Sequence, residues 1–434
     1  MTSIRPFQII LLGGFGFLAI VALIFFITFR GSSSSTSQLY GESVEVWGTF
    51  SASAFSVVLD EISRGDSAFQ AVHYIQKNKD TFDYELLNAI AAGRSPDLVV
   101  LSSEDLLTYQ NRLSKISFTT IPERTFRDSY IDGADIFLLN DGVYGIPFAV
   151  DPLVMYWNRD LLAKNGIAQP PATWEELVNV TTPAVTKVAA NREIIQSAVG
   201  LGEYSNIRNA KSILSMLFMQ AGTDIVSTGA QGIEITLGKS ANNNIPPGQA
   251  ALSFYTQFSQ SSGTTYSWNR SLREDRQAFL SEDLALYFGK GSEYKELQSA
   301  NPNLNFDIAQ VPQGAGANVV RDFGTFYAFA IPSAAANPQG GFAAAQVLAS
   351  QPNALMLTEA LNLAPVVRAE IALGTGSAYR QVLYRAALTA HAWLDPSALG
   401  SENVFKTMIE DVTSGRKRVS ESITDAVGRL QQLF

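Results

Sequence analysis

Polar side chains follow the ends of three strands predicted in the first 151 residues, and their chemistry would suit a ligand that carries hydroxyl groups. The set consists of Trp47, Thr49 and Ser51 after the first strand, Ser102, Ser103 and Glu104 after a later buried strand, and Asp151 at the exit of a third. Ligands of open α/β sheets bind outside the carboxyl ends of the strands. Carboxylates at such positions accept charge-assisted hydrogen bonds. These residues therefore form the first half of a candidate binding site.

Later segments supply the other half of the candidate site. The candidates are Trp268 and Asn269 in an aromatic polar turn, Ser292, Glu293 and Tyr294 after a strand within 279–291, and Thr325 and Tyr327 on a buried strand. An aromatic ring could stack on a ligand while its rim forms hydrogen bonds. The alternative for the aromatic residues is ordinary packing in the core or between lobes. For Glu104 and Asp151, the alternative is helix capping or an ion pair at a hinge.

The composition argues against several other chemistries. The chain carries 31 Lys+Arg against 40 Asp+Glu, a net charge of -9, and phosphate binding would need a basic surface. It contains 0 Cys, which excludes disulfides, zinc–thiolate sites and cysteine nucleophiles. His73 and His391 are the only histidines and lie far apart in sequence. We therefore expect no nucleic-acid partner, no metal and no cofactor.

Two segments predict an α/β body. Residues 83–101 combine an apolar helical face that ends at Gly93 with a continuous apolar strand. Residues 143–177 give a strand with a sharp exit at Pro147 and Asp151, an aromatic strand, a helix, a turn and a second helix. Buried strands flanked by helices indicate a parallel sheet.

The order of elements over 143–177 resembles the hinge region of bacterial extracellular solute-binding proteins, the receptors of ABC importers of the maltose-binding type. Residues 83–101 and 279–365 resemble the same family. The resemblance implies an α/β fold, a two-lobed periplasmic-binding-protein-like clamp of type II. By analogy, the lobe boundaries are 43–149 plus 325–365 for lobe 1, and 150–324 plus 366–434 for lobe 2.

Residues 1–42 are expected to lie outside the clamp. Residues 1–7 would be cytoplasmic, 8–29 a transmembrane anchor, and 30–42 a Ser-rich linker. The anchor has about 22 uncharged residues, enough to cross an apolar core of about 30 Å. The apolar run is longer than that of a cleaved signal peptide and lacks a small-residue cleavage site. A buried core helix is the other interpretation.

The resemblance implies a receptor on the extracytoplasmic side of the plasma membrane. It would capture a solute between two lobes and deliver it to ABC permease subunits. An aromatic content of 11% and the acidic candidates favour an oligosaccharide as the solute. We expect a monomer that is not an enzyme. The alternatives are a glycoside hydrolase that uses Glu104 and Asp151 as paired carboxylates, and a sensing or adhesion module without a permease.

Overall fold

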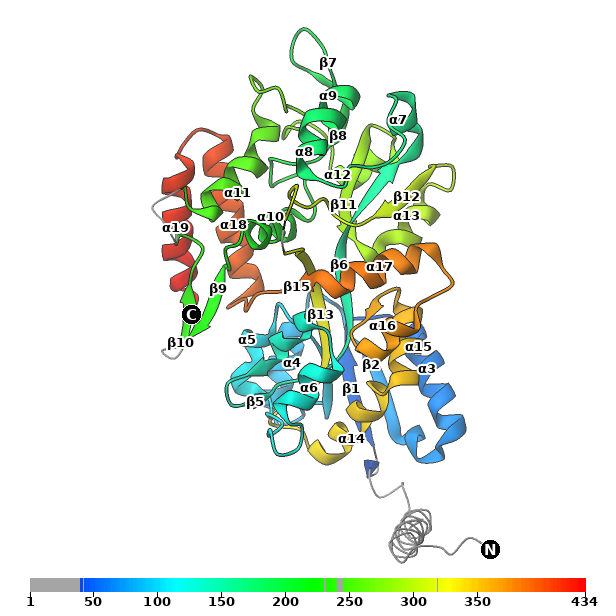
Figure 1. The fold of residues 1–434 in the computed structure, drawn as a ribbon. Coiled ribbons are helices and arrows are strands. Elements are labelled where there is room, and N and C mark those ends of the chain that lie inside the picture. The colour runs from blue at the N-terminus through cyan, green and yellow to red at the C-terminus, as the bar shows by residue number, and fades with distance from the viewer. Residues whose placement is uncertain (1–39, 42, 230–231, 240–244, 318) are drawn as a thin grey trace, which may run out of the picture.

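The computed structural model describes residues 40–41, 43–229, 232–239, 245–317 and 319–434, and it shows two α/β lobes joined at a waist (Figure 1). The expected anchor at 8–29 lies outside the described residues. Among the residues described, no helix is long and apolar enough to cross a membrane. The two-lobed α/β architecture predicted from the sequence is confirmed.

The first lobe contains a mostly parallel sheet. Its strands follow the order β2 (Val72–Gln76), β1 (Val44–Gly48), β3 (Leu98–Ser102), β13 (Asp322–Ala330) and β6 (Ile146–Asn158). Strands β2, β1 and β3 are parallel, and β13 is antiparallel to both β3 and β6. The helices of this lobe are α3 (Ala52–Gly65), α4 (Phe82–Ala91), α5 (Leu106–Tyr109), α6 (Glu123–Ser129), α14 (Pro338–Leu348), α15 (Gln351–Leu361) and α16 (Arg368–Leu373).

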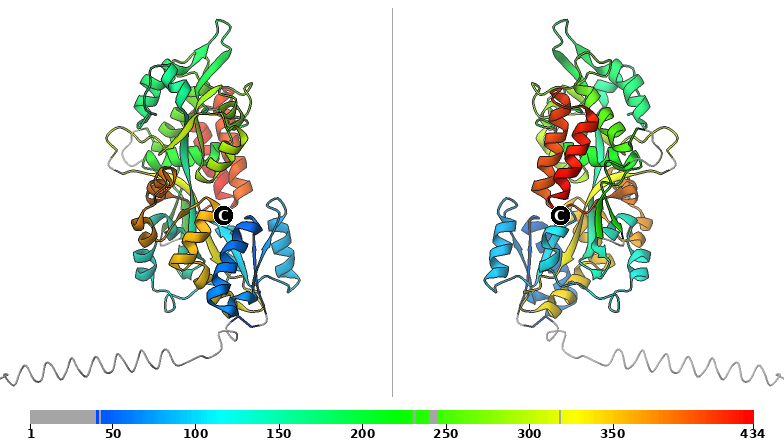
Figure 2. Two further views of the ribbon diagram at one scale, coloured as in Figure 1. Left: turned by 90° about the vertical axis from the view of Figure 1, so that its right-hand side faces the viewer. Right: turned by 90° about the vertical axis from the view of Figure 1, so that its left-hand side faces the viewer.

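The second lobe continues the sheet from the other half of β6. The strands are β11 (Leu284–Lys290), β8 (Ile194–Val199), β7 (Lys187–Val188) and β12 (Phe306–Ala309). The helices are α7 (Arg159–Lys164), α8 (Trp174–Glu176), α9 (Thr182–Val185), α10 (Ala210–Gln220), α11 (Pro247–Thr256), α12 (Asp275–Leu280), α13 (Tyr294–Ala300), α18 (Ala398–Thr413) and α19 (Val419–Gln431). Figure 2 shows that α18 and α19 lie side by side on this lobe. A separate hairpin consists of β9 (Val226–Gly229) and β10 (Gly232–Ile235).

Strand β6 joins the two lobes, and all of its residues are buried. It pairs with β13 in the first lobe and with β11 in the second. Pro147 cannot donate to the ladder. The register between β6 and β13 shifts beside it, at Tyr327 and Ala328. Tyr327 and Ala328 also pair with Ser102 and Leu101 of β3, so this irregularity lies within the first-lobe sheet.

Local sequence signals explain several element ends. Helix α4 is followed by Gly93, whose φ of 66° is readily adopted by glycine. Thr173 caps α8 by accepting a hydrogen bond from the Glu176 amide at 3.1 Å. The Glu176 carboxylate in turn accepts from the Ala172 amide at 2.9 Å. The helix end predicted at Gly93 is therefore confirmed, and Thr173 and Glu176 together cap the start of α8.

Two helices follow residue 365, where we expect the chain to return to the second lobe. Helix α16 packs against α6 and α15, so it lies with the first lobe and not with the second. Helix α17 (Ala378–Thr389) then runs along the waist, where it contacts β6, β12, β13 and the short strand β14 (Ala364–Pro365). Helix α16 follows the lobe boundary that we expect at 365, and the boundary itself stays a prediction.

Candidate ligand-binding site

A polar cavity of about 410 Å³ lies where strand ends of the two lobes meet. Residues of both lobes and of the hinge strands line it: Phe50, Lys79, Glu104, Asp151, Arg208, Asn209, Lys211, Ser212, Lys290, Ser292, Glu293, Glu296, Tyr327 and Glu402. Phe50 and Glu104 follow β1 and β3, and Lys290 ends β11. The carboxyl ends of parallel strands thus form the first-lobe wall, as the strand-end rule predicts.

Asp151 organises the floor of the cavity. It is buried on β6, and its two carboxylate oxygens accept hydrogen bonds from the Ser292 amide at 3.0 Å and the Ser292 hydroxyl at 2.7 Å. Burial raises the pKa of Asp151, while Lys290 and Ser292 oppose that rise. The preceding residue is Gly291, and a Cβ there would lie 2.4 Å from Leu383 Cδ2, so a larger residue would require Leu383 to shift.

Lys290 and Glu104 bring opposite charges to the cavity from different lobes. The Lys290 ammonium donates to the Thr325 hydroxyl at 3.0 Å. Burial alone would lower the pKa of Lys290, but Glu104 and other acidic neighbours raise it above its usual value. Burial would raise the pKa of Glu104, yet nearby lysines, Lys290 first among them, hold it below its usual value. Both side chains are therefore charged at neutral pH.

The second lobe supplies a rigid charged wall. Lys211 and Asp395 form a buried ion pair at 2.6 Å between the first turn of α10 and the segment before α18. Glu293 accepts from the Tyr287 hydroxyl at 2.8 Å and from the Lys290 amide at 2.9 Å. Buried charges fixed by several partners keep their positions, so this wall presents polar groups in a defined geometry.

Phe50 and Tyr327 supply the apolar surface of the cavity. Their ring centroids lie 4.8 Å apart with an interplanar angle of 69°, an edge-to-face pair. Both rings belong to the first lobe and are partly exposed. An apolar ring face opposite a wall of hydrogen-bonding groups would suit an amphipathic ligand such as a sugar ring.

The structure brings five of the predicted site residues together in this cavity. They are Glu104, Asp151, Ser292, Glu293 and Tyr327. Two further predicted residues do not line the cavity but form hydrogen bonds next to it. The Thr325 hydroxyl accepts from the Lys290 ammonium, and the buried Ser103 hydroxyl accepts from the Phe326 amide at 3.1 Å.

Other predicted residues near the strand ends do not line the cavity. Ser102 donates to Asp105 at 2.6 Å, and Ser51 shares a hydrogen bond with Ser53 at 2.7 Å. Trp47 lies under the ammonium of Lys77, 3.6 Å from the ring centroid. Thr49 is partly exposed and is likewise absent from the cavity lining.

The structure does not place Trp268, Asn269 or Tyr294 in the cavity, which corrects the prediction for these three residues. Trp268 is 1% exposed, and its indole Nε1 donates to the Asn206 side chain at 3.1 Å. Asn269 donates to the Tyr266 hydroxyl at 2.6 Å. Tyr294 stacks on Tyr379 with ring centroids 4.2 Å apart. Their apolar area is used in packing, the alternative that the sequence left open.

Sequence reasoning missed all four positively charged residues that line the cavity, Lys79, Arg208, Lys211 and Lys290, and it also missed Phe50. Phe50 lies between Thr49 and Ser51, and Lys290 directly precedes the predicted loop at 291–294, so a wider window at each strand end would have included both. Lys211, in contrast, lies within an otherwise apolar helix, and no local pattern shows that it reaches the cavity.

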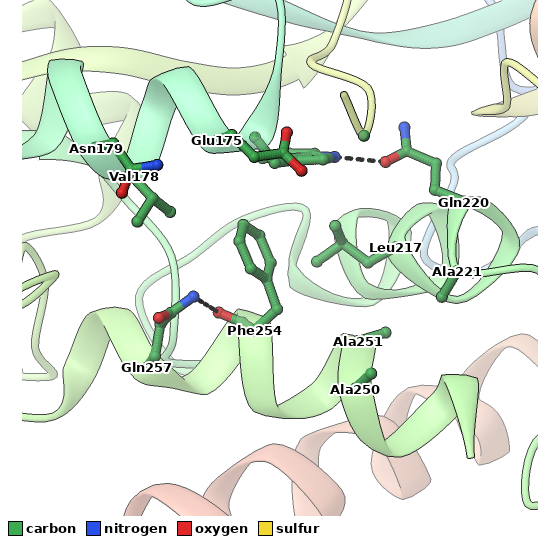
Figure 3. Close-up of a pocket in the computed structure, with 12 residues that line it drawn as sticks. Glu175, Val178, Asn179, Leu217, Gln220, Ala221, Ala250, Ala251, Phe254 and Gln257 are labelled. Carbon is green, nitrogen blue, oxygen red and sulfur yellow. Dashed lines mark hydrogen bonds between the residues drawn. The ribbon is translucent and has the colours of Figure 1, made fainter. Parts of the chain in front are cut away.

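A second cavity, also about 410 Å³, lies within the second lobe and differs in character (Figure 3). Its walls are largely apolar, with Leu217, Phe254 and Val178 on α10, α11 and the turn after α8. Gln220 accepts from the Trp174 indole at 2.6 Å and donates to two backbone carbonyls, so its amide is already satisfied. This cavity offers few polar groups to a solute, and the polar cavity between the lobes is the better candidate.

Comparison with known proteins decides the family. The model of the bacterial extracellular solute-binding protein family matches residues 71–379. The chain belongs to this family. A binding protein of Brucella abortus is 29% identical over 99 residues, and an uncharacterized lipoprotein of Streptomyces antibioticus is 27% identical over 168 residues. These matches span 24% and 34% of the two relatives' lengths, respectively.

Solved structures share the fold over most of the chain. A cyclo/maltodextrin-binding protein in complex with maltotetraose has a TM-score of 0.72 at 15% identity, covering 90% of this chain and 97% of that protein. The cyclic alpha-maltosyl-1,6-maltose binding protein of Arthrobacter globiformis has a TM-score of 0.72 at 16% identity, covering 90% and 98%. A solute-binding protein of Thermotoga lettingae bound to alpha-D-tagatose has a TM-score of 0.67 at 18% identity, covering 91% and 100%.

Proposed function

We propose that this solute-binding protein captures a carbohydrate in the polar cavity between its lobes. The observation that carries the proposal is the combination of the Phe50–Tyr327 ring pair with hydrogen-bonding side chains on the facing wall. Sugar rings present both an apolar face and a rim of hydroxyl groups. The sugars bound by proteins of the same fold, maltotetraose and tagatose, support this ligand class.

The two lobes would act as a clamp. Contacts from both lobes give a ligand higher affinity for the closed state, so binding shifts the population toward closure. The closed form would then deliver the sugar to an ABC permease, the function that the family membership supports. We propose that the protein acts as a monomer, anchored by residues 8–29 with the lobes on the extracytoplasmic side.

A direct test is calorimetric titration of residues 38–434 with a panel of neutral mono- and oligosaccharides. We expect at least one sugar to bind, and Phe50→Ala to weaken that binding about five- to tenfold by removing ring contacts. Tyr84→Ala is the matched control, because Tyr84 is 74% exposed on α4 of the same lobe and does not line the cavity. No binding across the panel, or equal binding by Phe50→Ala and Tyr84→Ala, would contradict the proposal.

The glycoside hydrolase alternative predicts a different result in the same experiment. Glu104 and Asp151 both line the cavity, but both oxygens of Asp151 are engaged by Ser292. We expect the titrated oligosaccharide to be recovered unchanged after long incubation. Its hydrolysis, abolished by Asp151→Asn, would instead favour the enzyme.

A further inference from the structure

Glu104 and Lys290 face the cavity from different lobes without contacting each other. Glu104 follows β3 in the first lobe, and Lys290 ends β11 in the second. Each shifts the pKa of the other toward its charged form. No ion pair within 4.0 Å joins them in the described part of the chain. Both side chains line the same cavity, so one ligand can meet both charges.

The other charges that line the cavity already have partners or lie at its rim. Glu293 and Glu296 pair with Arg276 at 3.2 and 3.1 Å, and Lys211 pairs with Asp395. The remaining members are Asp151 with Ser292, Glu402 with Tyr204, Arg208 with Glu274, and the exposed Lys79. Glu104 has no side-chain hydrogen bond or ion pair among the described residues, and the Lys290 ammonium has only the uncharged Thr325 hydroxyl as a partner, so these two partly buried charges are best placed to meet a ligand.

We propose that Glu104 and Lys290 form a charge filter that selects uncharged sugars over acidic and amino sugars. The inference rests on the carbohydrate function proposed above. A neutral sugar can donate one hydroxyl to Glu104 and accept from Lys290 with another, and both bonds are charge-assisted. A charged sugar gains from one of the two residues and is repelled by the other. It also loses the hydration of its own charge, so its net binding is weaker.

The filter predicts opposite effects for two substitutions. Glu104→Gln keeps a hydrogen-bonding side chain but removes the repulsion of a carboxylate, so an acidic sugar should gain relative to its neutral counterpart. Lys290→Gln removes the repulsion of an ammonium group, so an amino sugar should gain. Glu123→Gln on α6 and Lys295→Gln on α13 are matched controls, because both side chains are exposed and lie outside the cavity.

The experiment titrates each variant with sugar trios of one ring stereochemistry: glucose, glucuronate and glucosamine, then the galactose and mannose trios, each as mono- and disaccharides. For the trio that binds, we expect the neutral member to bind wild type at least tenfold more tightly than either charged member. Glu104→Gln should narrow the neutral-to-acidic ratio at least fivefold without narrowing the neutral-to-amino ratio, and Lys290→Gln should do the reverse. The controls should leave both ratios unchanged.

Two kinds of failure can be told apart. If the neutral sugar binds but the ratios are the same in Glu104→Gln, Lys290→Gln and the controls, the charge filter is wrong and the carbohydrate function stands. If the wild-type protein prefers a charged sugar of the trio to the neutral one, the charge filter is likewise wrong and the carbohydrate function stands. If no member of any trio and no neutral oligosaccharide binds the wild-type protein, the proposed function is wrong, and the filter falls with it.

Discussion

Glu370 is fully buried on α16, and neither of its carboxylate oxygens has a hydrogen-bond partner. Burial raises its pKa from the ordinary 4.5 to about 8. The folded protein therefore keeps a proton that the unfolded chain loses between about pH 4.5 and pH 8. The free energy of unfolding should fall as the pH rises through this window, because the unfolded state binds fewer protons there.

Replacing Glu370 with leucine should remove this pH dependence. A buried group without partners costs more than an apolar one of similar size. We expect Glu370→Leu to gain about 3–4 kcal/mol more stability at pH 8 than at pH 5, measured by urea unfolding at both values. Glu359→Leu, at a 55% exposed side chain on α15, should show no such difference. The same gain at both pH values would mean that Glu370 is ionised in the folded state.

Trp268 gives a second prediction at the residue scale, because its indole is buried and does not line the polar cavity. Trp268→Ala should lower the free energy of unfolding by about 3–5 kcal/mol through the cavity it leaves. The sugar affinity of the folded fraction should not change. Trp47→Ala, at a partly exposed ring, is the control and should cost far less. Weaker sugar binding with little loss of stability would show that Trp268 belongs to the binding site.

At the scale of elements, Asn362 links the end of α15 to the floor of the cavity. Its φ is 64°, its amide donates to the Ser292 carbonyl at 3.0 Å, and its side-chain oxygen accepts from the Tyr379 hydroxyl at 2.6 Å. Through Ser292 this network reaches Asp151 on β6. A first-lobe helix, the hinge strand and a second-lobe loop are therefore tied together beside the site.

Two substitutions separate the backbone role of Asn362 from its side-chain role. Asn362→Gly keeps the left-handed conformation and loses both hydrogen bonds, whereas Asn362→Ala loses them and also strains the backbone. We expect the alanine variant to be less stable than the glycine variant by about 1 kcal/mol in urea unfolding. Both should bind sugar more weakly than wild type, because Ser292 loses a support. Equal stability of the two variants would show that the backbone at the end of α15 changes conformation, so that alanine there causes no strain.

The elements near the hinge show how far sequence reasoning reaches. Local signals such as Gly93 and Thr173 mark helix ends, and the strand-end rule found Glu104, which follows β3. The strand exit predicted at Pro147 and Asp151 is wrong, because β6 runs unbroken from Ile146 to Asn158 and carries Asp151 into the cavity from its middle. Whether an aromatic residue faces the cavity or the core depends on contacts between distant segments. Trp268 and Asn206 are such a pair, and no local pattern reveals it. The same holds for Lys211, which is paired with Asp395 from far along the chain.

At the scale of the whole molecule, β6 and β13 continue from one lobe toward the other. Both strands are almost fully buried, and β6 passes from its pairing with β13 at Pro152 to its pairing with β11 at Leu153. Bending is therefore expected near this point, not within the lobes. We therefore expect the two lobes to move as units about this hinge. A sugar held by groups of both lobes would fix the distance between them.

The measurement that tests this most directly is the distance between the lobes with and without the sugar that binds. The chain contains 0 Cys, so Tyr84→Cys on α4 and Lys406→Cys on α18 can carry spin labels without background labelling. Both positions are exposed and lie on different lobes. Pulsed electron spin resonance should show a distance distribution that shifts to one shorter, narrower peak when the sugar is added, and Phe50→Ala should need more sugar for the same shift. Saturating sugar binding with an unchanged distance distribution would contradict the clamp.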